Sequence, residues 1–189
     1  MTTNIFRRII AALDQAGIKY MLTGSFASTY YGTPRTTQDI DLVIAPSANE
    51  LRAFIHLLPP EEYYVDLDAA LEAHARHSMF NLVDQVTGWK IDLIIRKPRA
   101  FSEEEFRRRT SAQVQGTNVY VATAEDLIIA KLEWAKRAQS QRQLEDVVGI
   151  LRLRGDSLDR AYIEKWVAEL QLGPEWKNAL LMAGTSTTG

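Results

Sequence analysis

Residues 36–44 read TTQDIDLVI, which places two carboxylates in a stretch otherwise suited to a buried strand. Ile40 and residues 42–44 are strand-forming aliphatic residues. Asp39 and Asp41 are two residues apart, so in a strand both side chains point to the same face, where like charges repel. Burial of an unpaired carboxylate is costly. This face therefore either opens to water or holds a positive group between the two carboxylates.

A second aliphatic stretch, WKIDLIIR at residues 89–96, carries a carboxylate at its centre. In a strand, Asp92 shares its face with Lys90. If this strand neighbours the first one in a sheet, Asp92 reaches the same face as Asp39 and Asp41. Three carboxylates on one face are typical of a hard-cation site, and oxygen ligands suit Mg²⁺ or Mn²⁺. A single aspartate of this kind is usually just solvated, but the combined pattern favours a metal site.

A glycine–serine pair precedes the aspartates. IKYMLT (18–23) indicates a strand, and Gly24-Ser25 follows it at the start of a helix that Gly32 ends. The free N–H groups and the dipole of a helix N-terminus favour a phosphate, and glycine lets the backbone approach one closely. A bare G-S pair is a weak signal, and its place between a strand and the aspartate pair strengthens it.

The alternation of strand and helix patterns predicts an α/β (α+β) fold, with a mixed sheet flanked by helices. Strands are expected at 18–23, 39–45, 62–66, 78–85, 90–96 and 118–122. Helices between them are expected at 4–16, 24–32, 48–58, 68–77 and 102–110. After residue 122 the pattern is only helical, with helices at 124–138, 140–152, 159–170 and 174–182. We therefore expect one domain over 1–122, a C-terminal helical region over 123–182 and a flexible tail over 183–189.

Composition narrows the function classes. The chain has 189 residues, of which 46% are hydrophobic and 24% charged, as in ordinary globular proteins. It has no cysteine, which excludes a disulfide framework, a thiolate metal site and a cysteine nucleophile. We see no signal peptide and no apolar run long enough to span a membrane, so a cytoplasmic protein is expected.

The charges in the sequence do not indicate a single class of binding partner. A net charge of −2 argues against non-specific coating of nucleic acid. Residues 96–109, RKPRAFSEEEFRRR, nevertheless form a local basic stretch. A solvated helix and a functional patch explain this stretch equally well.

The stretch LTGSFASTYYGTPRTTQDIDLVI (22–44) resembles the signature of the DNA polymerase β-like nucleotidyltransferase superfamily. That signature is an apolar strand, G-S, a helix, an aspartate pair spaced D-h-D on the next strand, and a third carboxylate on a later strand. The residues that match it are Gly24, Ser25, Asp39, Asp41 and Asp92.

A looser similarity points to one branch of that superfamily. GTPRTTQDIDLVI, together with TAEDLIIAKLEWA (123–135), is similar to bacterial nucleotidyltransferases of the AbiEii type, which act in abortive infection and as toxins. Their helical segment reads EDLI-x-x-K followed by K-D-x-x-D-I. Lys131 fits the first part and Asp146 the end of the second, whose acidic start this sequence lacks.

The resemblance implies a nucleotidyltransferase catalytic domain over 1–122 that moves NMP from an NTP to an acceptor hydroxyl. It implies two ions, Mg²⁺ or Mn²⁺, held by the three aspartates, with Asp92 also helping to deprotonate the acceptor. Gly24 and Ser25 would cradle the β- and γ-phosphates. Arg35 and Lys131 are candidates for offsetting the remaining triphosphate charge, although each is about as readily explained as an ordinary surface residue.

The acceptor and the biological role stay open at this point. The acceptor is either an RNA or tRNA 3′ end or a protein side chain. The resemblance also implies a role as one component of a toxin–antitoxin or abortive-infection pair with a cognate partner. The alternative is a catalytically silent nucleotidyltransferase fold that acts as a binding or regulatory module. A plain structural α/β domain would require the aspartate pattern to be a coincidence.

Overall fold

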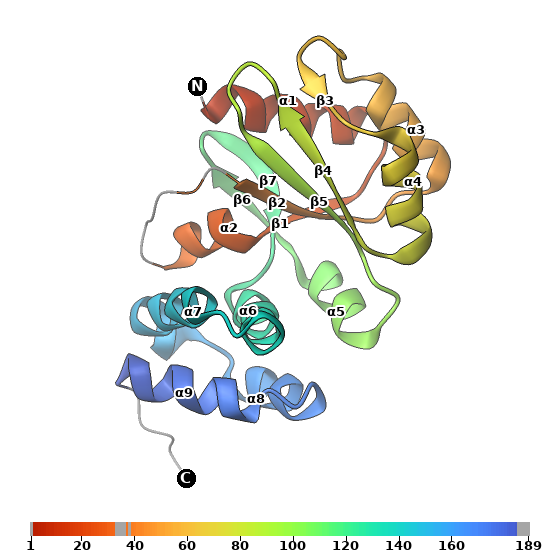
Figure 1. The fold of residues 1–189 in the computed structure, drawn as a ribbon. Coiled ribbons are helices and arrows are strands. Elements are labelled where there is room, and N and C mark those ends of the chain that lie inside the picture. Colours follow the sequence, from red (N-terminus) through yellow and green to blue (C-terminus); the bar gives the residue numbers. More distant parts are fainter. Residues whose placement is uncertain (1, 33–36, 38, 185–189) are drawn as a thin grey trace. The chain divides into compact units, whose positions relative to one another are not determined.

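A computed structural model describes residues 2–32, 37 and 39–184 of the chain (Figure 1). The chain divides into two compact units. The first, here called the sheet unit, consists of Met1–Phe26 and Thr37–Ala122. The second, the helical unit, consists of Ala27–Thr36 and Thr123–Gly189. Helix α2 (Gly24–Tyr31) therefore begins in the sheet unit and continues in the helical unit.

The sheet unit contains one seven-stranded sheet in the order β3-β4-β5-β2-β1-β7-β6. The pairs β2–β5 and β1–β7 are parallel, and the other neighbours are antiparallel. The strands are Tyr20–Thr23 (β1), Asp39–Ile44 (β2), Tyr63–Tyr64 (β3), Met79–Asp84 (β4), Lys90–Ile95 (β5), Thr110–Val114 (β6) and Thr117–Val121 (β7). The predicted fold class, α/β with a mixed sheet flanked by helices, is confirmed.

Strand β6 is the element that the sequence pattern does not indicate. The pattern predicts a helix as far as residue 110, whereas α5 ends at Arg108 and β6 begins at Thr110. β6 is an edge strand whose TSAQV sequence is polar and mostly exposed, so it lacks the apolar alternation that marks a half-buried strand. This segment forms a strand because it pairs with β7, and its local sequence does not predict a strand.

One face of the sheet is apolar across the central strands β2 and β5. Its central strands contribute Ile40, Leu42 and Ile44 from β2 and Ile91, Leu93 and Ile95 from β5, all at most 3% exposed. The helices α1 (Thr2–Gln15), α3 (Ala48–His56) and α4 (Leu67–Arg76) lie together beside the sheet (Figure 1). Side chains such as Phe6 and Phe54, both 0% exposed, complete this core.

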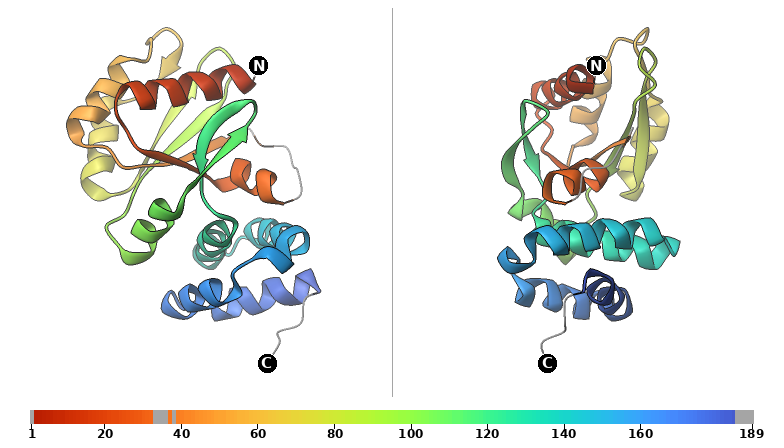
Figure 2. Two further views of the ribbon diagram at one scale, coloured as in Figure 1. Left: turned by 180° about the vertical axis from the view of Figure 1, so that it is seen from behind. Right: turned by 90° about the vertical axis from the view of Figure 1, so that its left-hand side faces the viewer.

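The opposite face is divided between an apolar and a polar half. Phe106 of α5 (Ala100–Arg108) packs with Met21, Val43 and Ala122 in a buried cluster. The same face of β2 then continues with Asp39 and Asp41, because alternate residues of a strand share a face. Figure 2 shows the sheet unit from two further sides. Helix α5 thus covers the apolar half and leaves the polar half for a site.

The helical unit is built from α6 (Ala124–Ala138), α7 (Gln141–Arg154), α8 (Arg160–Glu169) and α9 (Gly173–Ala183). A short 3-10 helix, Gly155–Ser157, follows α7. Ala27–Tyr31 of α2 belong to this unit, and at Gly32 an added Cβ would lie 3.2 Å from the backbone nitrogen of Ile150. Within the described residues, no helix has the length and hydropathy needed to cross a membrane.

Candidate active site

The parallel pairing of β2 with β5 brings the predicted carboxylates to one place in the sheet. Asp41 is the register partner of Asp92, and Asp39 is the partner of Lys90. Register partners on neighbouring strands point to the same face of a sheet. The two strands are therefore neighbours, as the predicted site requires, and the three carboxylates share a face with one ammonium group.

Asp92 is held by two donors. Its side chain is 13% exposed, and Nζ of Lys90 lies 2.9 Å from its Oδ1 and 3.1 Å from its Oδ2. Nδ2 of Asn81, on the neighbouring strand β4, donates to Oδ1 at 3.0 Å. The hydrogen bond with Asp92 raises the pKa of Lys90 above its ordinary value of 10.5, and the charges of Asp39 and Asp41 add to this effect. Lys90 is therefore a charged member of the site.

The sequence reasoning assigned no role to Lys90 or Asn81. The two-residue spacing between Lys90 and Asp92 already places both on one face of a strand, so the signal for Lys90 was present. Asn81 had no such signal, because its place beside Asp92 depends on the register of β4 with β5. That register is a property of the folded hairpin.

The Gly24–Ser25 turn is tied directly to Asp41. Gly24 has a φ of +64°, and a Cβ added there would lie 2.0 Å from Oδ2 of Asp41. The backbone N–H of Ser25 donates to the same Oδ2, with an N–O distance of 3.3 Å. Glycine is required at this position both for its backbone conformation and for the space that the carboxylate occupies. The turn and the aspartate pair thus form one site.

Three aromatic rings support the start of α2. Phe26, the residue after Ser25, stacks on Phe6 of α1 with ring centroids 6.1 Å apart. Trp89, at the end of the turn between β4 and β5, packs against Phe26 at 5.8 Å. The turn at Gly24–Ser25 is therefore anchored to α1 and to the hairpin that carries Asp92.

The donor set suits a hard divalent cation. Carboxylate oxygens are the ligands that Mg²⁺ and Mn²⁺ prefer. Here they lie on one face of the sheet, beside a turn that has no room for a side chain. In the part of the chain that the structure describes, no group of three or more acidic or histidine side chains is close enough to hold a metal ion. Convergence of Asp39, Asp41 and Asp92 on ions thus stays a prediction, and the ammonium of Lys90 is the cation beside Asp92 in this structure.

Comparison with protein families shows to which family the chain belongs. A family model described as uncharacterised nucleotidyltransferase matches residues 1–186. The chain belongs to this family. A search of curated proteins finds no match.

Solved structures share the fold of this nucleotidyltransferase. ANT(2″)-Ia in complex with adenylyl-2″-tobramycin is 15% identical with a TM-score of 0.58, and the alignment covers 90% of this chain and 97% of that one. The lincosamide adenylyltransferase LnuA, bound to lincomycin, is 13% identical with a TM-score of 0.54, covering 79% and 94%. An antigenic nucleotidyltransferase-like protein from Paracoccidioides brasiliensis is 18% identical with a TM-score of 0.54, covering 95% and 92%.

The structure describes one of the two cations predicted to bind phosphate. Arg35 is outside the described residues. Lys131 is in α6 of the helical unit and is 3% exposed. Its Nζ lies 2.7 Å from Oδ2 of Asp146 and donates to Oε1 of Gln143 at 3.0 Å. These contacts give Lys131 a structural role within the helical unit, and its contact with a nucleotide stays a prediction.

Part of the basic stretch is engaged locally. The guanidinium groups of Arg96 and Arg109 lie over the ring of Phe106, at 5.7 and 4.3 Å from its centroid. Arg107 pairs with Glu104 at 2.6 Å. Arg96 and Arg109 thus pack on α5, whereas the Arg107–Glu104 pair lies within that helix. A role of the stretch in binding an acceptor stays a prediction.

Replacement of Gly24 by alanine is expected to lower nucleotidyl transfer by about a hundredfold, the effect of displacing a reactive group by roughly 1 Å. The added Cβ cannot coexist with the Asp41 carboxylate at 2.0 Å, so the carboxylate must move. Steady-state kinetics, together with the free energy of unfolding, measure this effect.

Gly88→Ala is the matched control. Gly88 also has a positive φ, +74°, but a Cβ added there would meet no atom of the described residues within 4 Å beyond its own chain neighbours. Left-handed backbone strain should cost each variant about 1 kcal/mol of stability. Gly24→Ala should lose more than this because of its clash with Asp41, and only Gly24→Ala should lose activity. Equal activities in the two variants would show that the turn does not position Asp41.

Proposed function

We propose that this nucleotidyltransferase moves NMP from an NTP to an acceptor hydroxyl and uses Asp39, Asp41 and Asp92 as its metal ligands. One observation carries the proposal: Asp41 is the register partner of Asp92 and accepts a hydrogen bond from the turn at Gly24–Ser25. A phosphate site and an acidic site that are joined in this way suit a triphosphate and its accompanying cations.

Two ions, Mg²⁺ or Mn²⁺, would neutralise the triphosphate, activate the attacking hydroxyl and stabilise the leaving pyrophosphate. Asp39 and Asp41 would hold both ions, and Asp92 would complete the set. Gly24 and Ser25 would cradle the β- and γ-phosphates, with the Ser25 hydroxyl as a donor. Arg35 and Lys131 would offset the remaining negative charge of the triphosphate.

The transfer itself is a substitution at the α-phosphorus. The acceptor oxygen would lose its proton to a base, for which Asp92 is the candidate, and form a bond to the α-phosphorus. The bond between that phosphorus and the oxygen that bridges to the β-phosphate breaks, and pyrophosphate leaves with the electron pair. The remaining residues bind and orient the nucleotide.

The acceptor is proposed by class. The sequence similarity to AbiEii-type proteins supports an RNA or tRNA 3′ end, or a protein side chain, and with it a role in a toxin–antitoxin or abortive-infection pair. ANT(2″)-Ia and LnuA were solved with adenylyl-2″-tobramycin and lincomycin respectively, which adds small hydroxylated molecules to the acceptors to be tested.

A labelling experiment tests the function. The protein is incubated with each of the four α-³²P-labelled NTPs, with Mg²⁺ or Mn²⁺, and with total RNA, lysate protein or an aminoglycoside as acceptor. We expect label from one NTP in one acceptor class, and no label when EDTA replaces the metal. Failure of every NTP and acceptor, with nucleotide binding still present, would favour the catalytically silent module.

A further inference from the structure

Lys90 occupies a place in the site that the proposed mechanism does not use. It begins β5, it is the register partner of Asp39, and it precedes Asp92 by two residues on the same face. Its Nζ lies 2.9 and 3.1 Å from the two carboxylate oxygens of Asp92. An ammonium group therefore binds the oxygens that a metal ion at Asp92 would need.

Asp92 is also satisfied as a hydrogen-bond acceptor without any ion. Its Oδ1 accepts from Asn81 as well as from Lys90, and its side chain is only 13% exposed. A divalent cation at Asp92 competes with Lys90, because both bind the same two carboxylate oxygens and two cations in contact repel each other. Metal binding at this residue is therefore an exchange.

We propose that Lys90 is a built-in counter-ion that competes with the divalent cation for Asp92 and makes metal binding depend on the nucleotide. This inference rests on the proposed function, because it takes Asp92 as a metal ligand. In the exchange, the hydrogen bonds between Asp92 and Lys90 break and a bond from Asp92 to the metal forms. The ammonium keeps its proton and needs another anion, which a triphosphate supplies.

The strength of the pair suits such an exchange. The side chain of Lys90 is 41% exposed, so its pairing with Asp92 is partly screened by water. The ammonium is carried by a flexible four-carbon chain and can move between partners. Without Lys90, three carboxylates on one face would repel each other. Lys90 thus positions Asp92 in the metal-free protein and lowers its affinity for a metal.

Lys90→Met tests the competition, since it removes the charge and keeps a side chain of similar length. Mn²⁺ binding without nucleotide, followed by electron paramagnetic resonance, should become at least about tenfold tighter, the lower end of the effect of a neighbouring charge on a carboxylate. Lys90→Arg should bind Mn²⁺ as weakly as the wild type. Lys19→Met, which removes an exposed lysine before β1, is the control for net charge.

Thermal unfolding gives an independent measurement. Mn²⁺ alone should raise the Tm of Lys90→Met, whereas the wild type should respond mainly to Mn²⁺ together with tripolyphosphate. Equal or weaker Mn²⁺ binding in Lys90→Met than in the wild type would overturn the inference, as would the absence of binding in every variant at millimolar Mn²⁺.

These measurements do not depend on catalysis. If Lys90→Met binds Mn²⁺ more tightly than the wild type, but the wild type transfers no nucleotide, the proposed function is refuted and the role of Lys90 as a counter-ion stands. Transfer by the wild type, with unchanged Mn²⁺ affinity in Lys90→Met, would refute only the role of Lys90.

Discussion

Replacement of Asp41 by asparagine is expected to lower NMP transfer by about a thousandfold, the upper range for removal of one electrostatic contact in a transition state. Asparagine keeps the shape of the side chain and an oxygen that can accept from the N–H of Ser25, which now bonds Oδ2 of Asp41 at 3.3 Å. The variant therefore removes the charge and spares the turn. Steady-state transfer from the NTP that gives label in the proposed labelling experiment measures the loss.

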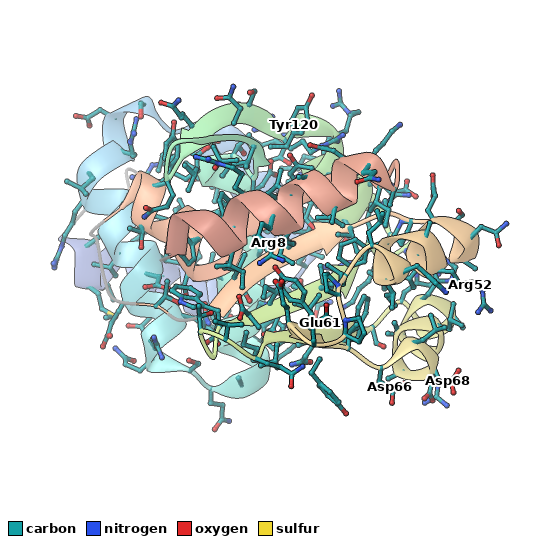
Figure 3. All side chains as sticks on the ribbon, turned by 90° about the horizontal axis from the view of Figure 1, so that it is seen from above. Arg8, Arg52, Glu61, Asp66, Asp68 and Tyr120 are labelled. Atoms are coloured by element: carbon teal, nitrogen blue, oxygen red, sulfur yellow. The ribbon has the colours of Figure 1, made fainter. Side chains whose placement is uncertain are left out.

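The thermal stability of Asp41→Asn shows whether its loss of transfer has a catalytic or a structural cause. Asp39, Asp41 and Asp92 share one face, so removal of one charge reduces repulsion, and Asp41→Asn should have a Tm in EDTA at or above that of the wild type. Asp68→Asn is the control, because Asp68 is an exposed residue in the first turn of α4, at the outer edge of that helix (Figure 3). Transfer by Asp41→Asn at the rate of Asp68→Asn would rule out Asp41 as a metal ligand.

Replacement of Lys131 by methionine should have the largest effect on stability. Lys131 and Asp146 are 3% and 8% exposed and lie 2.7 Å apart, so the substitution removes the ammonium partner of a buried carboxylate. Removal of one partner of a buried pair costs about 3–5 kcal/mol. Urea denaturation should show a loss of this size. Lys136→Met, at an exposed position of the same helix, should cost about 0.5 kcal/mol.

A double variant separates folding from nucleotide binding. Lys131→Met with Asp146→Leu replaces the whole ion pair by apolar groups, which is often neutral for stability. We expect most of the lost stability to return while the KM for the NTP stays about tenfold above wild type, the effect of one lost charge-assisted contact. A KM that returns to the wild-type value would mean that Lys131 acts only within the fold.

The site could be predicted from sequence to the extent that local geometry determines it. The two-residue spacing of Asp39 and Asp41 places them on one face of any strand, and Gly24-Ser25 after an apolar strand predicts a turn at a helix start. Strand β6 could not be predicted, because its polar sequence has no periodicity and its partner is β7. The pairing of Lys131 with Asp146 likewise depends on how α6 packs against α7.

Local sequence specifies which residue types this protein offers to a nucleotide: a glycine–serine turn, two aspartates on one strand and a third on another. These features follow from spacings of one or two residues, over which backbone geometry leaves little freedom. The folded sheet alone places β2 beside β5, so that Asp41 meets Asp92, and brings Lys90 and Asn81 to Asp92. Strand order and register depend on contacts between segments remote in the chain, and no local pattern specifies them.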